Sequence, residues 1–266
     1  SDIEKKGVKV SMFESGSMEG DDSSCAAYMD CILGRGPKYV FKNAKLRKYF
    51  KEVSMHSYWS GADTKKNAEN YFSDKYSKYS VAATKYCQMT DDKNTGVYDL
   101  IAKEKNGTNG TSIKYGVAMA NTIVDDLTIM NANEWDWWTA CSYGTYTDGL
   151  IYLDEDNHEN LDFSKRYYCL GNFSKFIKEG AVRVACSSGV KNVRSVAFVN
   201  EDNTVVTVYV NNNDKKAYTT IDCEGDYAVY TTDRDNDIAK TDFGKAKKVK
   251  VSLPASSVVT VVYEAK

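Results

Sequence analysis

The sequence of 266 residues contains only two prolines and two histidines, and it lacks the marks of several protein classes. No apolar run approaches the ~20 residues that a membrane-spanning helix needs. The 35 Lys and Arg residues nearly balance the 37 Asp and Glu residues, so no field of one sign attracts nucleic acid or an anionic membrane. We therefore expect a soluble globular protein with no nucleic-acid partner and no membrane span.

The seven cysteines, at positions 25, 31, 87, 141, 169, 186 and 223, are odd in number and form no CxxC pair. This pattern predicts neither a complete disulfide framework nor a zinc site, and we expect most of them to be buried thiols. Two Asn/Asp clusters, residues 211–214 and 233–237, lack the Gly and Glu of a calcium-binding EF-hand loop and are predicted to be hairpin turns. No metal or organic cofactor is expected.

Aromatic residues, in contrast, are plentiful: 20 Tyr, 9 Phe and 4 Trp. Tyr and Trp combine a flat apolar face with a polar group, which suits both protein interfaces and the CH-rich faces of sugar rings. The alternative is that these rings simply fill a core.

The residues up to about 177 alternate short apolar runs with longer helical stretches, which is typical of βα units. The expected strands are residues 8–15, 50–59, 80–89 and 132–141, and the expected helices are residues 23–33, 64–77, 112–130 and 164–177. A loop is expected between residue 141 and the last helix.

From Gly180 onward the apolar period changes to two, which predicts an antiparallel β-sandwich. The expected strands are residues 181–187, 193–200, 203–212, 216–224, 227–233, 247–254 and 256–265. We place a domain boundary here, which gives a first domain of residues 1–178 and a second of residues 179–266.

The two halves together carry familiar motifs. The succession ESGS, HSYW, TKYC, NEWDWW and SYG, followed by LGNFSKFIKEGAVRV and LPASSVVTVVY, resembles the C-terminal portion of glycoside hydrolase family 30. This family includes β-xylanases, endo-β-1,6-galactanases and glucosylceramidases.

The resemblance implies a (β/α)₈ TIM-type barrel with a β-sandwich fastened to its side. This chain is similar to strands five to eight of that barrel and to most of the sandwich, because only four βα units precede the sandwich, whereas the barrel has eight. The resemblance places the acid/base glutamate at the end of strand four, outside this sequence. It places the nucleophile glutamate at the end of strand seven, where this chain has Lys85.

The resemblance also implies a sugar cleft at the C-terminal ends of the strands. Glu14 ends the first strand, and the alternative for it is a solvated helix cap. His56, Tyr58 and Trp59 end the second strand, and alternation sends His56 and Tyr58 to the same face. The alternative for His56 is a core histidine.

Three more candidates follow the third and fourth strands. Tyr86 borders the site after Lys85, and Trp138 and Tyr143 match the sugar-stacking aromatic residues of the family, whereas Trp137 is expected to point into the helix layer.

Glu134 and Asp136 lie two residues apart, which places both on one face of a strand. Their spacing suits paired carboxylates, but the resemblance gives them no catalytic role.

The residue at position 85 determines whether the chain has the nucleophile of a retaining glycosidase. A retaining glycosidase needs two carboxyl groups ~5–5.5 Å apart, one of which attacks the anomeric carbon. A lysine ammonium has no lone pair for this attack and repels the positive charge of the oxocarbenium-like transition state.

Three functions therefore compete. The chain is the C-terminal portion of a secreted or cell-surface glycosidase acting on a β-linked polysaccharide, a degenerate relative that binds glycans without cutting them, or an interaction module whose open half-barrel docks a partner. The partner in the last case is a separate N-terminal half-barrel or a second copy of the chain. The N-terminus lacks the apolar core of a signal peptide, so a secreted form is expected to have lost its leader.

Overall fold

The computed structural model describes residues 10–18, 29–30, 49–88, 93, 111–144, 146–154, 156–157 and 159–264. Most of the helix expected at 23–33 lies outside these residues, as do Cys25 and Cys31. The chain divides into two compact units. The first unit comprises Ser1–Tyr98 and Asp125–Trp138, and the second comprises Asp99–Val124 and Thr139–Lys266.

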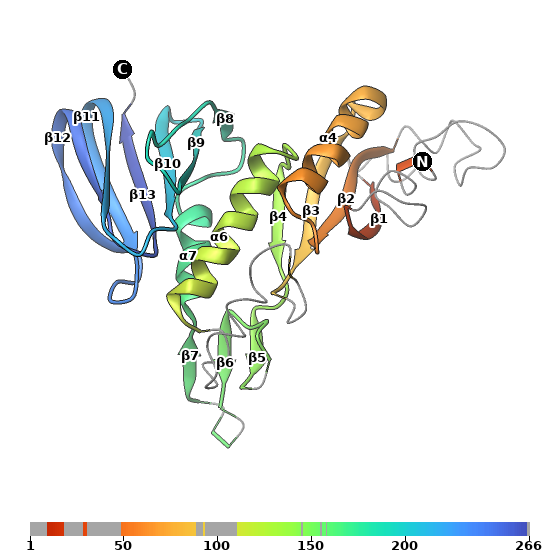
Figure 1. Ribbon diagram of the computed structural model, residues 1–266, viewed down its shortest axis with the longest axis horizontal. Helices are drawn as coiled ribbons and strands as arrows, with labels where there is room; N and C mark the ends of the chain where they lie inside the picture. Colours follow the sequence, from red (N-terminus) through yellow and green to blue (C-terminus); the bar gives the residue numbers. More distant parts are fainter. Residues whose placement is uncertain are drawn as a thin grey trace. The chain divides into compact units, whose positions relative to one another are not determined.

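The first unit contains a four-stranded parallel sheet in the order β1-β2-β3-β4 (Figure 1). Its strands are β1 (Val10–Ser17), β2 (Phe50–Tyr58), β3 (Ser80–Tyr86) and β4 (Glu134–Trp137). All four match expected strands. β4 is shorter than expected, because the chain leaves the sheet after Trp137 and Cys141 begins another strand.

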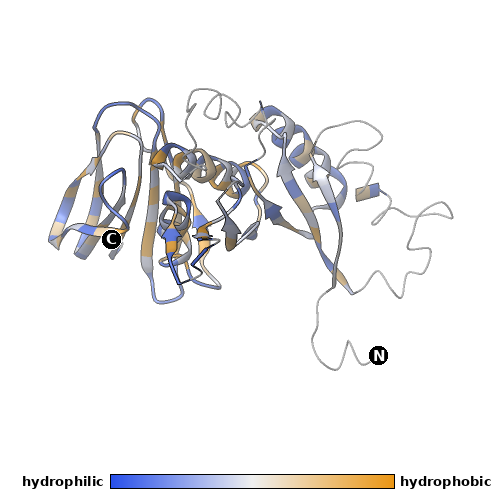
Figure 2. Cartoon of the chain, turned by 90° about the horizontal axis from the view of Figure 1, so that it is seen from below, coloured by the Kyte–Doolittle hydropathy of each residue, from blue (hydrophilic) through white to orange (hydrophobic). Residues whose placement is uncertain are grey.

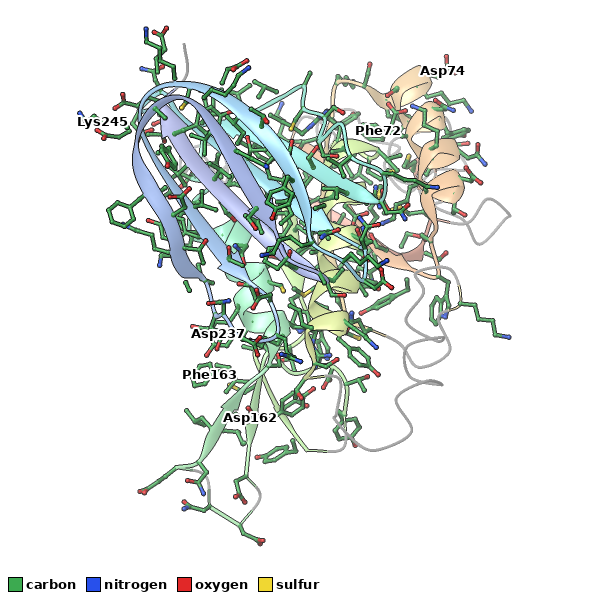
Figure 3. The ribbon with its side chains drawn as sticks, turned by 60° about the vertical axis from the view of Figure 1, so that its left-hand side comes forward. Phe72, Asp74, Asp162, Phe163, Asp237 and Lys245 are labelled. Carbon is green, nitrogen blue, oxygen red and sulfur yellow. The ribbon has the colours of Figure 1, made fainter. Side chains whose placement is uncertain are left out.

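Helix α4 (Ala62–Tyr76) covers one face of this sheet. Its buried residues Lys65, Ala68 and Phe72 recur at helical spacing, so they form one stripe. Ala68 and Phe72 pack against residues of β2 and β3 in a shared apolar cluster. Phe72 is labelled in Figure 3 together with Asp74, which lies on the exposed side of the same helix.

Helix α6 (Ile113–Thr128) follows, and its last residues belong to the first unit. Helix α7 (Lys165–Ser174) belongs to the second unit. Both were expected from their apolar periodicity. Between β4 and α7, where a loop was expected, the second unit forms a small sheet of β5 (Cys141–Tyr143), β6 (Ile151–Leu153) and β7 (Leu161–Phe163). Strands of three residues are too short to give a period-two signal in the sequence.

The C-terminal part forms a six-stranded sheet in the order β12-β11-β13-β10-β9-β8, and all of its pairs are antiparallel. The strands are β8 (Val182–Val184), β9 (Val193–Val199), β10 (Thr204–Asn211), β11 (Ala217–Thr232), β12 (Ala239–Leu253) and β13 (Ser257–Glu264). Figure 2 shows hydrophobic and hydrophilic residues mixed along these strands. A partial (β/α) barrel followed by a β-sandwich is the fold class that the sequence predicted.

Two details of the sandwich differ from expectation. The strands expected at 216–224 and 227–233 are one strand, β11, because Gly225 (φ 125°) sits at a β-bulge rather than a turn. On the N-terminal side of Gly225, Ile221 and Cys223 join Val193 and Tyr209 in the sandwich core.

Of the two expected hairpin turns, residues 233–237 do join the neighbours β11 and β12, and the backbone N–H of Asp233 donates to the carbonyl of Asn236 at 3.1 Å. Residues 211–214 are not a hairpin turn. They connect β10 to β11, and β13 lies between these two strands. The short polar cluster resembles a hairpin loop, and only long-range strand pairing reveals the difference.

Buried polar groups anchor α7 within the second unit. Asn172 is fully buried, and its side-chain amide donates to the Thr260 hydroxyl at 2.9 Å and accepts from the Thr232 hydroxyl at 2.5 Å. Asn172 begins an Asn-Phe-Ser glycosylation motif. Its burial excludes a glycan at this position in the folded protein.

The described cysteines, residues 87, 141, 169, 186 and 223, are all free thiols, and Cys87, Cys169 and Cys223 are buried. Within the part of the chain that the structure describes, no three His, Cys, Asp or Glu residues gather in a way that could hold a metal ion. No helix of these residues has the length and hydropathy needed to span a bilayer.

Candidate functional site

The candidate site lies on the face of the sheet β1–β4 opposite helix α4, which we call the open face. Val53 and Met55 of β2 pack in the apolar cluster under α4, so alternation turns Glu52, Ser54 and His56 to the other face. The open face includes Glu14, Glu52, Ser54, His56, Tyr58, Ala82, Lys85, Glu134, Asp136 and Trp138. Barrel interiors are usually filled with branched aliphatic side chains, whereas most of these residues are polar, charged or aromatic.

Glu14 and His56 form a pair at one end of the open face. The Nε2 atom of His56 lies 2.9 Å from Oε2 of Glu14. His56 is buried, whereas the Glu14 side chain is half exposed. The edge of the Tyr58 ring contacts the His56 ring at a centroid distance of 5.5 Å. The imidazole is therefore held by a carboxylate on one side and a ring on the other.

Lys85 and Trp138 form the second pair. Lys85 pairs with His56 in the register of β2 and β3, after a register shift that leaves Thr84 as an extra residue on β3. Its Nζ atom stands 4.7 Å from the centroid of the Trp138 ring, within the range of a cation–π interaction. The backbone N–H of Trp138 donates to the carbonyl of Tyr86 at 2.9 Å. This bond holds the main chain of Trp138 at the end of the sheet, and the residue is 51% exposed.

Glu134 and Asp136 share the open face, as alternation predicted, and their carboxyl groups are hydrogen-bonded to each other. Partial burial raises the pKa of Glu134, and the charge of Asp136 raises it further. Partial burial also raises the pKa of Asp136, and the charges of Glu14 and Glu52 add to this effect, while the hydrogen bond from Glu134 opposes it. Carboxylates from β1, β2 and β4 therefore act on one another across the open face.

These raised pKa values predict a pH dependence of stability. Between the ordinary and the raised pKa, the folded state binds more protons than the unfolded state, so acidification through this window stabilises the fold. The double variant Glu134→Gln/Asp136→Asn should lose the part of this stabilisation that comes from protonating Glu134 and Asp136. Urea unfolding at several pH values from about 7 down to about 4 tests this, with tryptophan fluorescence as the readout. All four tryptophans lie in the first unit.

Subtracting the pH profile of the variant from that of the unmodified protein removes the contribution of titrating groups that are not coupled to Glu134 or Asp136. The open-face groups that remain are Glu14, Glu52, His56 and Lys85. Identical profiles for the two proteins would contradict the carboxylate coupling.

The remaining sequence candidates lie in different surroundings. Tyr58 and Tyr86 are buried and stack on each other at 5.8 Å between centroids. Trp59 packs beside Tyr58, and Trp137 packs against Tyr86 and Trp135. Tyr143 lies on β5 of the second unit and is 43% exposed. Contacts between any of the candidate residues and a glycan stay a prediction.

A buried ion pair lies on the helix side of the sheet, opposite the open face, and no sequence motif predicted it. Nζ of Lys65 on α4 lies 2.7 Å from Oδ1 of Asp126 on α6, and both side chains are fully buried. Oδ2 of Asp126 accepts hydrogen bonds from the Ser57 hydroxyl at 2.6 Å and from Nε1 of Trp135 at 2.9 Å. Ser57 follows His56, and Trp135 lies between Glu134 and Asp136. The only sequence signal is a carboxylate within the apolar run of the helix.

The geometry limits the chemistry that the described residues can perform. Two carboxyl groups flanking a glycosidic bond stand ~5–5.5 Å apart in retaining enzymes and farther apart in inverting ones. Glu134 and Asp136 are hydrogen-bonded to each other, which differs from two separate carboxyl groups that flank a glycosidic bond. Glu14 is engaged with His56. What remains is an exposed indole beside an ammonium and several carboxylates, which is an arrangement suited to binding.

Comparison with known proteins agrees with this architecture. The model of the family described as O-Glycosyl hydrolase family 30 matches residues 10–152. The model of the Glycosyl hydrolase family 30 beta sandwich domain matches residues 180–261. The predicted domain boundary between residues 178 and 179 stays a prediction, since the compact units divide the chain elsewhere.

Solved structures show a similar fold. The chain superposes on the family 30 subfamily 8 xylanase Xyn30A from Clostridium acetobutylicum with a TM-score of 0.67 and 21% identity, covering 98% of this chain and 57% of that one. A conserved exported protein from Bacteroides fragilis gives a TM-score of 0.72 and 21% identity, with coverage of 98% and 57%.

The catalytic domain of xylanase C from Talaromyces cellulolyticus gives a TM-score of 0.68 and 18% identity, with coverage of 99% and 54%. The chain thus spans little more than half the length of these structures. The family model that matches the parallel-sheet region covers more than half of the chain. The chain belongs to glycosyl hydrolase family 30.

Proposed function

We propose that this chain binds a β-linked glycan on the open face and does not cleave it by the retaining mechanism. The observation that carries the proposal is the ammonium of Lys85 beside the exposed ring of Trp138. By resemblance to the family, position 85 is where the nucleophilic carboxylate stands. A protonated amine offers no lone pair to the anomeric carbon, and its charge opposes the oxocarbenium-like transition state.

Binding does not need the missing carboxylate. A half-exposed indole offers an apolar surface to the CH face of a pyranose ring, and the ammonium and carboxylates around it can hydrogen-bond sugar hydroxyls. His56 is held rigidly by Glu14 and Tyr58, so it can present a fixed polar edge. The family membership supports a glycan as the ligand, and the exported relative from Bacteroides fragilis supports a secreted or cell-surface location.

The alternative that the open half-barrel docks a protein partner receives less support. A dry protein interface buries a mainly apolar core. The described residues of the open face include four carboxyl groups and an ammonium. A separate half-barrel or a second copy covering this face would have to leave these charges in water or pair each of them.

A binding titration tests the proposal. Neutral and charged β-glycan oligosaccharides are added to the purified chain while tryptophan fluorescence is followed. Because all four tryptophans lie in the first unit, a ligand on the open face should change the spectrum in a saturable way. An unchanged spectrum and no heat of binding with every oligosaccharide would overturn the proposal and favour an interaction module.

A further inference from the structure

We infer that the open face selects its glycan by charge, and that its preferred ligand is a β-glycan carrying protonated amino groups, such as glucosamine units, rather than a uronate. This inference rests on the proposed function and adds the chemical class of the ligand. It departs from what Lys85 alone suggests, since a single ammonium at the centre of a glycan site would favour an acidic sugar.

The charge balance of the open face is the first argument. Glu14, Glu52 and the Glu134–Asp136 pair oppose the ammonium of Lys85. Because the hydrogen bond between Glu134 and Asp136 requires one proton, the formal excess is two negative charges when His56 is neutral. These carboxylates come from β1, β2 and β4, so they surround the face instead of lying on one edge. Glu134 and Asp136 are exposed, and the Glu14 side chain is half exposed, so a ligand can reach them.

The second argument is that Asp136 reports the field that a ligand would meet. Burial raises the pKa of Asp136, and the charges of Glu14 and Glu52 raise it further. A uronate carboxylate entering beside Asp136 would meet the same repulsion. An ammonium entering there would be attracted, and it could donate up to three charge-assisted hydrogen bonds to the carboxylates.

The third argument concerns the aromatic ring. Trp138 already holds a cation over its ring, because Nζ of Lys85 lies 4.7 Å from the ring centroid. Trp138 follows directly after β4, two residues beyond Asp136. An amino sugar stacked on the exposed part of this ring would bring its amine close to these carboxylates. Stacking and charge pairing thus act on the same ligand.

The test uses three hexasaccharides with one β-1,4-linked pyranose backbone: the glucosamine hexamer, cellohexaose and the glucuronic acid hexamer. Calorimetry is performed with the full chain at about pH 6, where amines are protonated and carboxylates largely ionised. We expect the glucosamine hexamer to bind about tenfold more tightly than cellohexaose and the uronate hexamer about tenfold more weakly. Added salt should bring the affinities for the three hexasaccharides closer together, because it screens the charges.

Two variants test whether Glu134 and Asp136 cause this charge preference. Glu134→Gln/Asp136→Asn should reduce the preference for the glucosamine hexamer over cellohexaose to less than about threefold, because only the charges are removed. Asp226→Asn on β11 of the second unit is the matched control, since Asp226 is an exposed carboxylate whose partner is Lys245. This control should keep the full preference.

The outcomes separate the two proposals. If cellohexaose binds and the glucosamine hexamer binds no more tightly, the charge preference is wrong while glycan binding stands. If the uronate hexamer binds most tightly, the preference is reversed and the inference is overturned. If none of the three binds, the proposed function itself is contradicted, and the inference falls with it.

Discussion

Replacing Asp126 with alanine should lower the free energy of unfolding of the first unit by about 3–5 kcal/mol, because it leaves the Lys65 ammonium buried without a counter-charge. Both side chains are fully buried, and their charged atoms are 2.7 Å apart. The same change removes the acceptor for Ser57 and for the Trp135 indole. Urea unfolding followed by tryptophan fluorescence measures the loss in the first unit.

Two controls separate the buried charge from other causes. Lys66 is the next residue on α4 and pairs with Glu69 at 2.8 Å on the exposed side of the helix, so Lys66→Ala should cost less than about 1 kcal/mol. The double variant Lys65→Met/Asp126→Leu removes both charges together and should cost much less than Asp126→Ala. A loss below about 1 kcal/mol for Asp126→Ala would show that Lys65 finds water or another partner.

Replacing Trp138 with alanine should weaken glycan binding by about tenfold to a hundredfold, the loss expected for a ring that supplies the main stacking surface. The ring is 51% exposed and little of it is needed for packing, so the fold should survive. Calorimetry with the tightest-binding oligosaccharide measures the loss.

Phe243→Ala is the matched control for this change. Phe243 is a 70% exposed ring on β12 of the second unit, so its removal should leave the affinity unchanged. Equal losses from the two variants would point to a non-specific effect of exposed rings. No loss from Trp138→Ala would remove this residue from the site.

Much of the fold could be predicted from local pattern. The four parallel strands were recognisable because each is a short apolar run followed by a helical period or a turn signal. The bulge at Gly225 and the connection at residues 211–214 were misread, because a Gly or Asn cluster marks a break in a strand without saying which strands then pair. That information lies in long-range pairing.

The candidate site, like the fold, could be predicted from the sequence only in part. Alternation placed Glu134 and Asp136 on one face, and the family resemblance picked out Lys85. The sequence could not show that Lys85 rests over Trp138 or that Glu14 holds His56, because these contacts join different strands. Nor could it show that the ion pair of Lys65 and Asp126 supports the open face from the helix side.

The most direct test of the central claim is a search for a covalent intermediate. The purified chain is incubated with an activated 2-deoxy-2-fluoro β-glycoside, which traps the nucleophile of a retaining enzyme without needing its acid, and its intact mass is measured beside a retaining glycosidase as positive control. The ammonium at position 85 predicts an unchanged mass for this chain. A stoichiometric glycosyl adduct on the natural protein would contradict the account.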